Sequence, residues 1–146
     1  MEFEAKTFDE LTTRELYEIL KARCLIFTVE QKIICVDPDG MDYQSLHCFL
    51  EDGGNIIAYL RAFVEDEKTG TVKIGRVLSV THGEGHGTKL MRLAIPEIKN
   101  RLGCQKISVH AQKHAESFYA LFGFKPVSDD FLEEGVLHVA MELDAP

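Results

Sequence analysis

Three alternating glycines lie where a strand-like run of apolar residues gives way to a helix-like run. Residues 82–87 read HGEGHG. Backbone N–H groups at the start of a helix have no intrahelical partner, and they lie at the positive end of the helix dipole. Because glycine has no Cβ, a ligand can approach this backbone closely. The pattern predicts a phosphate-binding turn, and Lys89 and Arg92 add positive charge nearby.

The spacing of these glycines excludes the two commonest nucleotide-binding motifs. A Walker loop requires a glycine followed by lysine, whereas Gly87 is followed by Thr88. The dinucleotide fingerprint also fails, because Gly87 comes one position too early to be its third glycine. A phosphate-containing ligand of another class is expected, and a nucleotide bound by the same turn is an alternative.

The composition is that of a single folded domain. The chain has 146 residues, of which 45% are hydrophobic and 27% charged. This length buries one core without the help of disulfides or metals. The sequence contains no internal repeat, linker or low-complexity segment, so we expect one domain over residues 1–146.

The net charge bears on the partners of this domain. Sixteen Lys and Arg against 24 Asp and Glu give a net charge of −8 at pH 7. A nucleic-acid-binding surface needs clustered positive charge, so nucleic acid is not an expected partner. A negative field instead favours a cationic small molecule. A monomer and a homodimer are both compatible with the sequence.

The cysteines and the N-terminus point to a cytoplasmic protein. The four cysteines form no Cys-x-x-Cys pair and do not cluster with histidines, so neither a metal site nor a redox motif is expected. Free thiols suit a reducing cytoplasm. The N-terminal MEFEAKTFDE is acidic and unlike a signal peptide, and no apolar run reaches the length of a membrane span, so no membrane partner is expected.

Hydrophobic periodicity predicts a mixed α/β sheet with helices packed on it. The first helix begins at the capping box formed by residues 12–15, and an ordered loop is expected over residues 33–44. A second helix follows Gly87 and ends at Gly103, and a third carries Ala115 to Phe122. The predicted strands span residues 3–8, 46–51, 55–65, 71–80, 107–111 and 136–143.

Several segments resemble the GNAT superfamily of N-acetyltransferases. The family's acetyl-coenzyme A loop has Gln or Arg at its first position and two small residues after it. Gly85 and Gly87 match, and His82 stands at the first position. Residues 111–127 resemble the second family motif, a helix that carries a tyrosine and ends in Gly-Phe. The chain also resembles the ElaA-like branch of this superfamily, at His47 and in residues 23–31, 37–42, 58–62, 110–112 and 132–141.

This resemblance implies a fold and an activity. The fold is the GNAT-like acyl-CoA N-acyltransferase fold, a central and mostly antiparallel sheet with flanking helices, in which two strands splay apart to admit the pantetheine arm. The activity is direct transfer of acetyl from acetyl-CoA to a primary amine of a small molecule or peptide, with no metal. The alternative is a noncatalytic acyl-CoA-binding or regulatory domain of the same fold.

The resemblance also implies residues that contact the coenzyme. Tyr119 occupies the position of the family tyrosine beside the departing sulfur, and Gln112 occupies a position where the family often has Asn. Tyr119 is accordingly the candidate general acid. The complete candidate coenzyme-binding set is Leu78, Ser79, Val80, His82, Gly83, Glu84, Gly85, His86, Gly87, Thr88, Gln112, Phe118 and Tyr119.

Acetylation of an amine also needs a general base. A lysine-like amine of pKa about 10.4 is almost entirely protonated at pH 7, so a proton must be removed before attack. Three residues are candidates: Glu30 at the end of the first helical region, His110 at the end of a strand, and His138 in the last strand. The sequence does not rank them, and a water relay is a further route.

An acidic loop completes the set of notable residues. Asp37, Asp39 and Asp42 are spaced like the start of a calcium loop, but the twelfth position falls on Cys48, which supplies no carboxylate. These carboxylates either cap turns or shape the acceptor pocket. If they face the pocket, they favour a basic acceptor.

Overall fold

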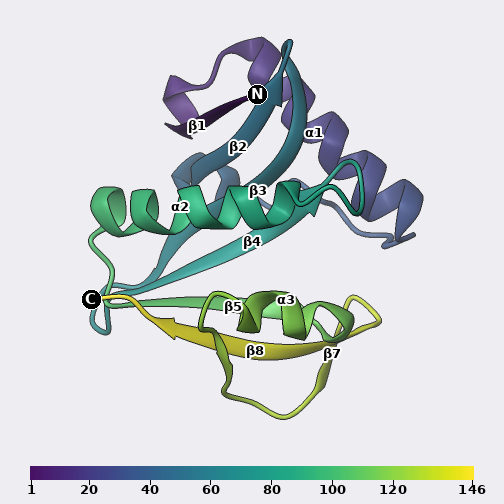
Figure 1. The fold of residues 1–146 in the computed structure, drawn as a ribbon. Coiled ribbons are helices and arrows are strands. Elements are labelled where there is room, and N and C mark those ends of the chain that lie inside the picture. Colours follow the sequence, from purple (N-terminus) through teal and green to yellow (C-terminus); the bar gives the residue numbers. More distant parts are fainter.

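The computed structural model describes every residue from Met1 to Pro146. Its strands form one sheet in the order β1-β2-β3-β4-β5-β8-β6, with β7 also paired to β8 (Figure 1). The strands are β1 (Glu2–Thr7), β2 (Leu46–Asp52), β3 (Asn55–Asp66), β4 (Thr71–Ser79), β5 (Lys106–Gln112), β6 (Lys125–Pro126), β7 (Phe131–Glu133) and β8 (Val136–Asp144). The helices are α1 (Thr13–Arg23), a π-helical segment (Cys24–Glu30), α2 (His86–Leu102) and α3 (Glu116–Ala120).

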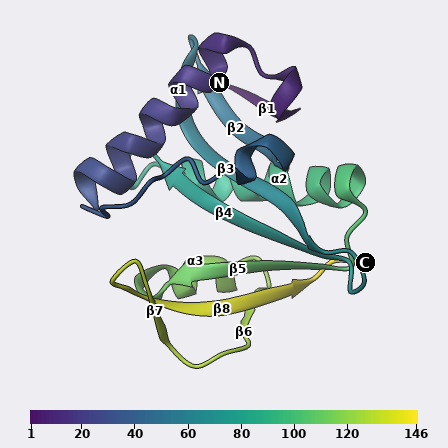
Figure 2. The ribbon, with the colours of Figure 1, turned by 180° about the vertical axis from the view of Figure 1, so that it is seen from behind.

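The sheet consists of two antiparallel halves that meet at a single parallel pair. β1 to β4 form one half, and β5 to β8 form the other. β4 and β5 pair only over residues 71–74 and 106–109, and beyond these residues the two strands diverge (Figure 2). The register of β4 shifts against β3 between Tyr59 and Arg61, opposite Arg76, whose φ is 52°. A bulge of this kind bends a strand and supports the divergence.

Helices cover opposite faces of the first half because side chains alternate along its strands. On one face, α2 packs Leu90, Met91, Ala94 and Ile98 on the main core. On the other face, Ile19 of α1 and Ile26 of the π-helical segment form a smaller core with Phe49, Tyr59 and Leu78. Both helical layers thus pack against the strands that lead to the glycine turn after β4.

The capping residues form the helix ends that the sequence predicts. The Thr12 Oγ1 accepts from the Glu15 N–H at 3.0 Å, and the Glu15 carboxylate accepts from the Thr12 N–H at 2.8 Å. Gly103 ends α2 with φ 59°, and its N–H donates to the Lys99 carbonyl. These contacts satisfy backbone groups that a helix end otherwise leaves unpaired.

The structure confirms the predicted order of the major elements and corrects several details. Two short strands, β6 and β7, were not predicted, because neither is long enough to show periodicity. α2 begins at His86 rather than after Gly87. The third helix is a 3-10 turn at Lys113–Ala115 followed by the short α3. None of the helices combines the length and apolar character needed to cross a membrane.

Candidate active site

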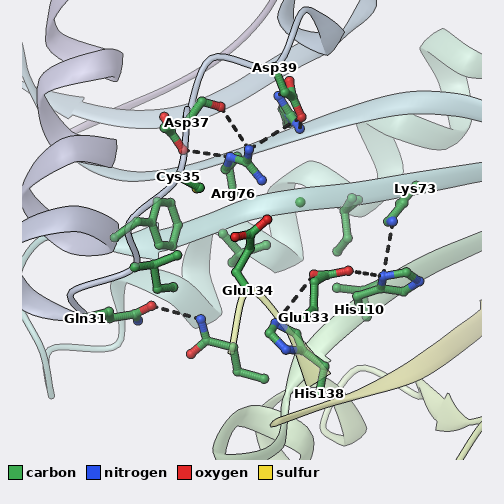
Figure 3. Close-up of a pocket in the computed structure, with 18 of the residues that line it drawn as sticks. Gln31, Cys35, Asp37, Asp39, Lys73, Arg76, His110, Glu133, Glu134 and His138 are labelled. Atoms are coloured by element: carbon green, nitrogen blue, oxygen red, sulfur yellow. Dashed lines mark hydrogen bonds and ion pairs between the residues drawn. The ribbon is translucent and has the colours of Figure 1, made fainter. Parts of the chain in front are cut away.

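A cavity of about 650 Å³ opens where β4 and β5 diverge (Figure 3). Its walls come from β4, β5, the β7–β8 turn and the loop that follows the π-helical segment. Apolar side chains, among them Phe27, Ile33 and Phe63, alternate with charged ones in the lining. Sites for small molecules commonly have this form, with a few polar groups in an otherwise apolar wall.

A carboxylate between two histidines lies in this cavity. The Glu133 Oε1 accepts a hydrogen bond from the His110 Nδ1 at 2.8 Å, and its Oε2 lies 3.6 Å from the His138 Nε2. Burial by itself would raise the pKa of Glu133, but the His110 hydrogen bond and the charges of His110, His138 and Lys73 outweigh it and lower that pKa. Glu133 is therefore ionised at neutral pH, so it can stabilise a proton taken up by a neighbouring ring.

The hydrogen bonds of His138 define its tautomer. Its Nδ1 lies 2.7 Å from the Val136 carbonyl oxygen, which can only accept, so this nitrogen carries a hydrogen. In the neutral ring the Nε2 is then unprotonated and able to take a proton. The side chain of His138 is buried, and its Nε2 faces the ionised Glu133. A proton accepted at this nitrogen would form an ion pair with that carboxylate.

His110 is held differently. Its Nδ1 lies 3.3 Å from the Lys73 Nζ and 2.8 Å from Glu133. Because one ring nitrogen cannot accept from lysine and donate to a carboxylate at once, the shorter contact favours donation to Glu133. His110 thus orients the carboxylate between the two rings.

Tyr119 lines the same cavity. The residue is 6% exposed, and its hydroxyl makes no hydrogen bond within the chain. Burial raises the pKa of Tyr119. The hydroxyl therefore keeps its proton at neutral pH and can donate it, as the predicted general acid must.

The structure thus brings together three of the four predicted catalytic side chains. Tyr119, His110 and His138 all line the cavity, as does Gln112, whose Nε2 donates to the Gln31 Oε1 at 2.9 Å. Glu133 is not among the residues predicted from the sequence. The sequence does contain a signal for its position. Two residues, Glu134 and Gly135, separate Glu133 from Val136, and this spacing is typical of a hairpin turn, which would place Glu133 and Glu134 at one end of the hairpin.

Glu30 lies elsewhere. It is outside the cavity lining, and its Oε1 lies 2.5 Å from the His82 Nε2 at the start of the glycine turn. Both side chains are well exposed. The pair connects the end of the π-helical segment to the glycine turn and is separate from the histidine pair in the cavity.

The glycine turn has unpaired backbone donors. Gly85 has φ 75° and caps α2, and the first helical hydrogen bond runs from the Lys89 N–H to the Gly85 carbonyl. The N–H groups of His86, Gly87 and Thr88 consequently have no acceptor within the chain. The buried His86 Nδ1 also lacks a partner. This donor set suits the phosphates of a coenzyme.

Other residues of the predicted coenzyme-binding set already make contacts within the protein. The Leu78 side chain is buried in the smaller core, the Val80 N–H donates to the Ile57 carbonyl, and the Ser79 hydroxyl donates to the Thr81 carbonyl. Phe118 lies beside the turn, since a Cβ at Gly87 would be 3.5 Å from its ring. Leu78 and Val80 can therefore offer a ligand chiefly their remaining backbone groups.

Three arginines neutralise the acidic loop beside the cavity. Arg23, which is fully buried, contacts Asp37 at 2.8 Å and Asp42 at 2.7 Å. Arg61 contacts Asp39 at 2.6 Å and Asp42 at 3.0 Å. Arg76 contacts Asp37 at 2.8 Å and Asp39 at 3.5 Å. The loop is thus fixed to α1, β3 and β4 by ion pairs.

These ion pairs bear on whether the aspartates favour a basic acceptor. Asp37 and Asp39 do line the cavity, but three positive charges offset the three carboxylates, so the loop by itself does not favour a basic acceptor. The pairing of the arginines with this loop could not be predicted from the sequence, because they are scattered along α1, β3 and β4.

We expect Arg23→Ala to destabilise the fold severely. The change leaves Asp42 and Asp37 in a largely buried site without one of their cations, and breaking a buried pair typically costs about 3–5 kcal/mol. Urea unfolding would measure the loss. Arg101→Ala, which removes an exposed pair with Glu10, should change the unfolding free energy very little. Similar effects of the two variants would contradict a structural role for the network.

The same network makes the fold sensitive to acid. The Arg61 hydrogen bond holds the pKa of Asp39 below its ordinary 3.8. Burial would raise the pKa of Asp42, but Arg23 and Arg61 outweigh it and lower that pKa. Because the folded-state pKa values are depressed, this stabilisation is complete above the unfolded-state value of 3.8 and is lost as the pH falls below it.

Comparison with known proteins decides the family. Residues 14–145 match the family model described as an acetyltransferase (GNAT) domain. The chain belongs to the GNAT acetyltransferase family. Protein ElaA of Escherichia coli is 32% identical over 136 residues, which cover 90% of this chain and 89% of that protein. A UPF0039 protein of Schizosaccharomyces pombe is 36% identical over 148 residues, 99% of this chain and 97% of that protein.

Solved structures agree with this GNAT assignment. An acyl-CoA N-acyltransferase from Pseudomonas aeruginosa superimposes with a TM-score of 0.89 at 32% identity, covering 97% of this chain and 99% of that one. E. coli ElaA superimposes with a TM-score of 0.88 at 31% identity, covering 97% of each chain. The predicted resemblance to the ElaA-like GNAT proteins and the predicted fold class are confirmed. Family membership implies acyl-CoA-dependent acetyl transfer.

Proposed function

We propose that this GNAT protein transfers acetyl from acetyl-CoA directly to a primary amine of a small molecule or peptide. One observation carries the proposal: the Tyr119 hydroxyl, which has no hydrogen-bond partner in the chain, and the His138–Glu133 pair line the same cavity between the diverging strands. A proton donor and a proton acceptor in one cavity are what acyl transfer to an amine requires.

The glycine turn is the proposed site for the coenzyme phosphates. The unpaired N–H groups of His86, Gly87 and Thr88 are the donors, and Phe118 borders the turn. The cavity opens where β4 and β5 diverge and is lined by Gln112 and Tyr119. Acetyl-CoA, when bound, supplies the thioester that the amine attacks.

His138 is the proposed general base. Its Nε2 takes a proton from the acceptor ammonium, and the resulting imidazolium pairs with Glu133. The neutral amine then forms the new C–N bond as the C–S bond breaks. A second proton released from the nitrogen leaves through the same pair or through solvent, so the product is a neutral amide.

Tyr119 is the proposed general acid. Its hydroxyl gives a proton to the departing thiolate, so that the second product leaves as a thiol. Since burial raises the pKa of Tyr119, the phenolate recovers a proton readily before the next turnover.

Two measurements test this function in sequence. Isothermal titration with acetyl-CoA, with ATP and NAD as controls, is expected to show binding of acetyl-CoA alone; binding of ATP or NAD instead would indicate a nucleotide-binding protein. A thiol-release assay with a panel of primary amines is then expected to show turnover. Acetyl-CoA binding without thiol release from any amine would instead establish a noncatalytic acyl-CoA-binding domain.

Two glycine variants test the coenzyme site. Gly85→Asp and Gly87→Asp would each place a carboxylate beside the proposed phosphate position, and we expect the Kd for acetyl-CoA to rise at least about tenfold by charge repulsion. Gly53→Asp is the matched control, because Gly53 also has a positive φ, 58°, with open space around it, but lies in the β2–β3 turn. An unchanged Kd for acetyl-CoA in both site variants would show that the coenzyme phosphates do not bind at this turn.

A further inference from the structure

Two oppositely charged residues in the cavity have a backbone conformation that side chains rarely adopt. The chain has three non-glycine residues with positive φ, and two of them, Arg76 at 52° and Glu134 at 49°, line the cavity. The third, Lys32 at 58°, does not line it. A left-handed conformation is costly for a residue with a Cβ, and such residues gather at functional sites. Two residues that line one cavity therefore adopt a conformation that is energetically unfavourable for them.

Arg76 is oriented by the acidic loop, with one nitrogen left over. Its Nε lies 2.8 Å from the Asp37 Oδ1, and its Nη2 donates to the Asp37 carbonyl at 2.9 Å and contacts Asp39 at 3.5 Å. The Nη1 has no partner in the chain. The guanidinium is thus fixed in position and still has a donor group available.

Glu134 occupies the turn between β7 and β8. Glu133 pairs with Val136, so Glu134 and Gly135 form a two-residue turn with φ values of 49° and 74°. Such turns favour Asn, Asp or Gly at the first position. Whereas the Glu133 carboxylate is held by His110 and His138, the Glu134 carboxylate contacts no cation or hydrogen-bond donor of the chain.

The two side chains face each other without pairing. Figure 3 shows the Glu134 carboxylate pointing toward Arg76 across the cavity. No ion pair joins them, so their charged atoms are more than 4.0 Å apart. An unpaired carboxylate facing an unpaired guanidinium nitrogen presents one anionic and one donating contact to the same ligand.

We propose that Glu134 and Arg76 select a zwitterionic acceptor, a small molecule with both a primary amine and a carboxylate, such as an amino acid. The ammonium binds Glu134, which lines the same cavity as His138, the proposed base. The acceptor carboxylate binds the Arg76 Nη1, and the apolar lining takes the side chain of the amino acid. This inference rests on the proposed function and defines the substrate class of the same site.

Matched acceptors test the substrate class. Each proteinogenic amino acid is compared in the thiol-release assay with the amine obtained by removing its carboxylate. We expect kcat/KM to be about 10- to 100-fold higher for the best amino acids than for their decarboxylated amines, the effect of one hydrogen bond to a charged group. Amines that equal or exceed their amino acids across the panel would overturn the inference.

Two variants test separately whether Glu134 binds the ammonium and whether Arg76 binds the carboxylate of the acceptor. Glu134→Gln should raise the KM for the amino acid about 10- to 100-fold and change kcat little, because it weakens ammonium binding alone. Arg76→Lys keeps a positive charge for the aspartates but removes the spare guanidinium donor. It should abolish the preference for amino acids over amines. Retention of that preference in both variants would contradict the assignment.

A stability measurement separates this role from a structural one. Glu134→Asn places a residue favoured in this turn, so we expect the melting temperature to rise by roughly 2–4 °C while the KM for the amino acid also rises. Lys32→Asn is the matched control, with the same backbone conformation outside the cavity, and should leave KM unchanged. A fall in melting temperature for Glu134→Asn with unchanged KM would indicate a structural role instead.

Failure of the proposed function can be told apart from failure of this inference. If acetyl-CoA binds but no amine releases thiol, amino acids are titrated into the CoA-saturated protein by calorimetry. Binding that is lost in Glu134→Gln would support the zwitterion site in a noncatalytic domain. No binding of any amino acid would overturn the site.

Discussion

Tyr119→Phe should lower kcat by about 10²- to 10⁴-fold, the usual contribution of a general acid. The hydroxyl makes no hydrogen bond within the chain, and its ring packs against Phe118 and Phe124. Phenylalanine therefore keeps the packing and removes only the proton donor. Steady-state thiol release would measure the loss in kcat, and calorimetry should show an unchanged Kd for acetyl-CoA.

Tyr17→Phe is a suitable control for this variant. Tyr17 lies on α1 and is 68% exposed, so loss of its hydroxyl should change neither kcat nor acetyl-CoA binding. Full activity in Tyr119→Phe would show that Tyr119 is not the general acid. A parallel loss of acetyl-CoA binding would assign the hydroxyl to coenzyme binding instead.

His138→Gln is expected to lower kcat by a similar factor, about 10²- to 10⁴-fold, with acetyl-CoA binding preserved. The variant loses the only nitrogen that both faces Glu133 and is unprotonated in the neutral tautomer defined by Val136. Steady-state thiol release measures the loss in kcat, and calorimetry checks that acetyl-CoA still binds.

Two further variants compare the candidate bases. Glu133→Gln removes the charge that stabilises protonated His138, so kcat should fall here too, although the residue contacts no reacting atom. Glu30→Gln tests the remaining candidate, which lies outside the cavity. A large loss of kcat in Glu30→Gln, with retained activity in His138→Gln, would instead assign the role of base to Glu30.

Much of the fold could be predicted because its signals are local. The capping box at Thr12 and the glycine at 103 mark helix ends through contacts between neighbours in the chain. The apolar positions of α2 and the alternating residues of β2 and β3 follow the periods of their own elements. By contrast, β6 and β7 are only two and three residues long and form through pairing with β8.

The candidate site was predicted in part for the same reason. Residues within a contiguous motif, such as the glycine turn and Tyr119, were found from the order of residues alone. Glu133 was not, because its role depends on the pairing of β7 with β8 and of β8 with β5, which brings it to His110 and His138. Charge compensation of the acidic loop likewise depends on contacts between residues 14 to 39 positions apart.

The sequence by itself determined the α/β fold class, the glycine turn and the family of this protein, since these follow from periodicity and from residues that are neighbours in the chain. Only the tertiary structure decided which candidate residues share a cavity. It placed Glu30 with His82, His138 with Glu133, and Arg76 opposite Glu134. The physical reason is that strand pairing and burial, rather than sequence spacing, determine the distances between groups from different elements and so the chemistry that they can perform together.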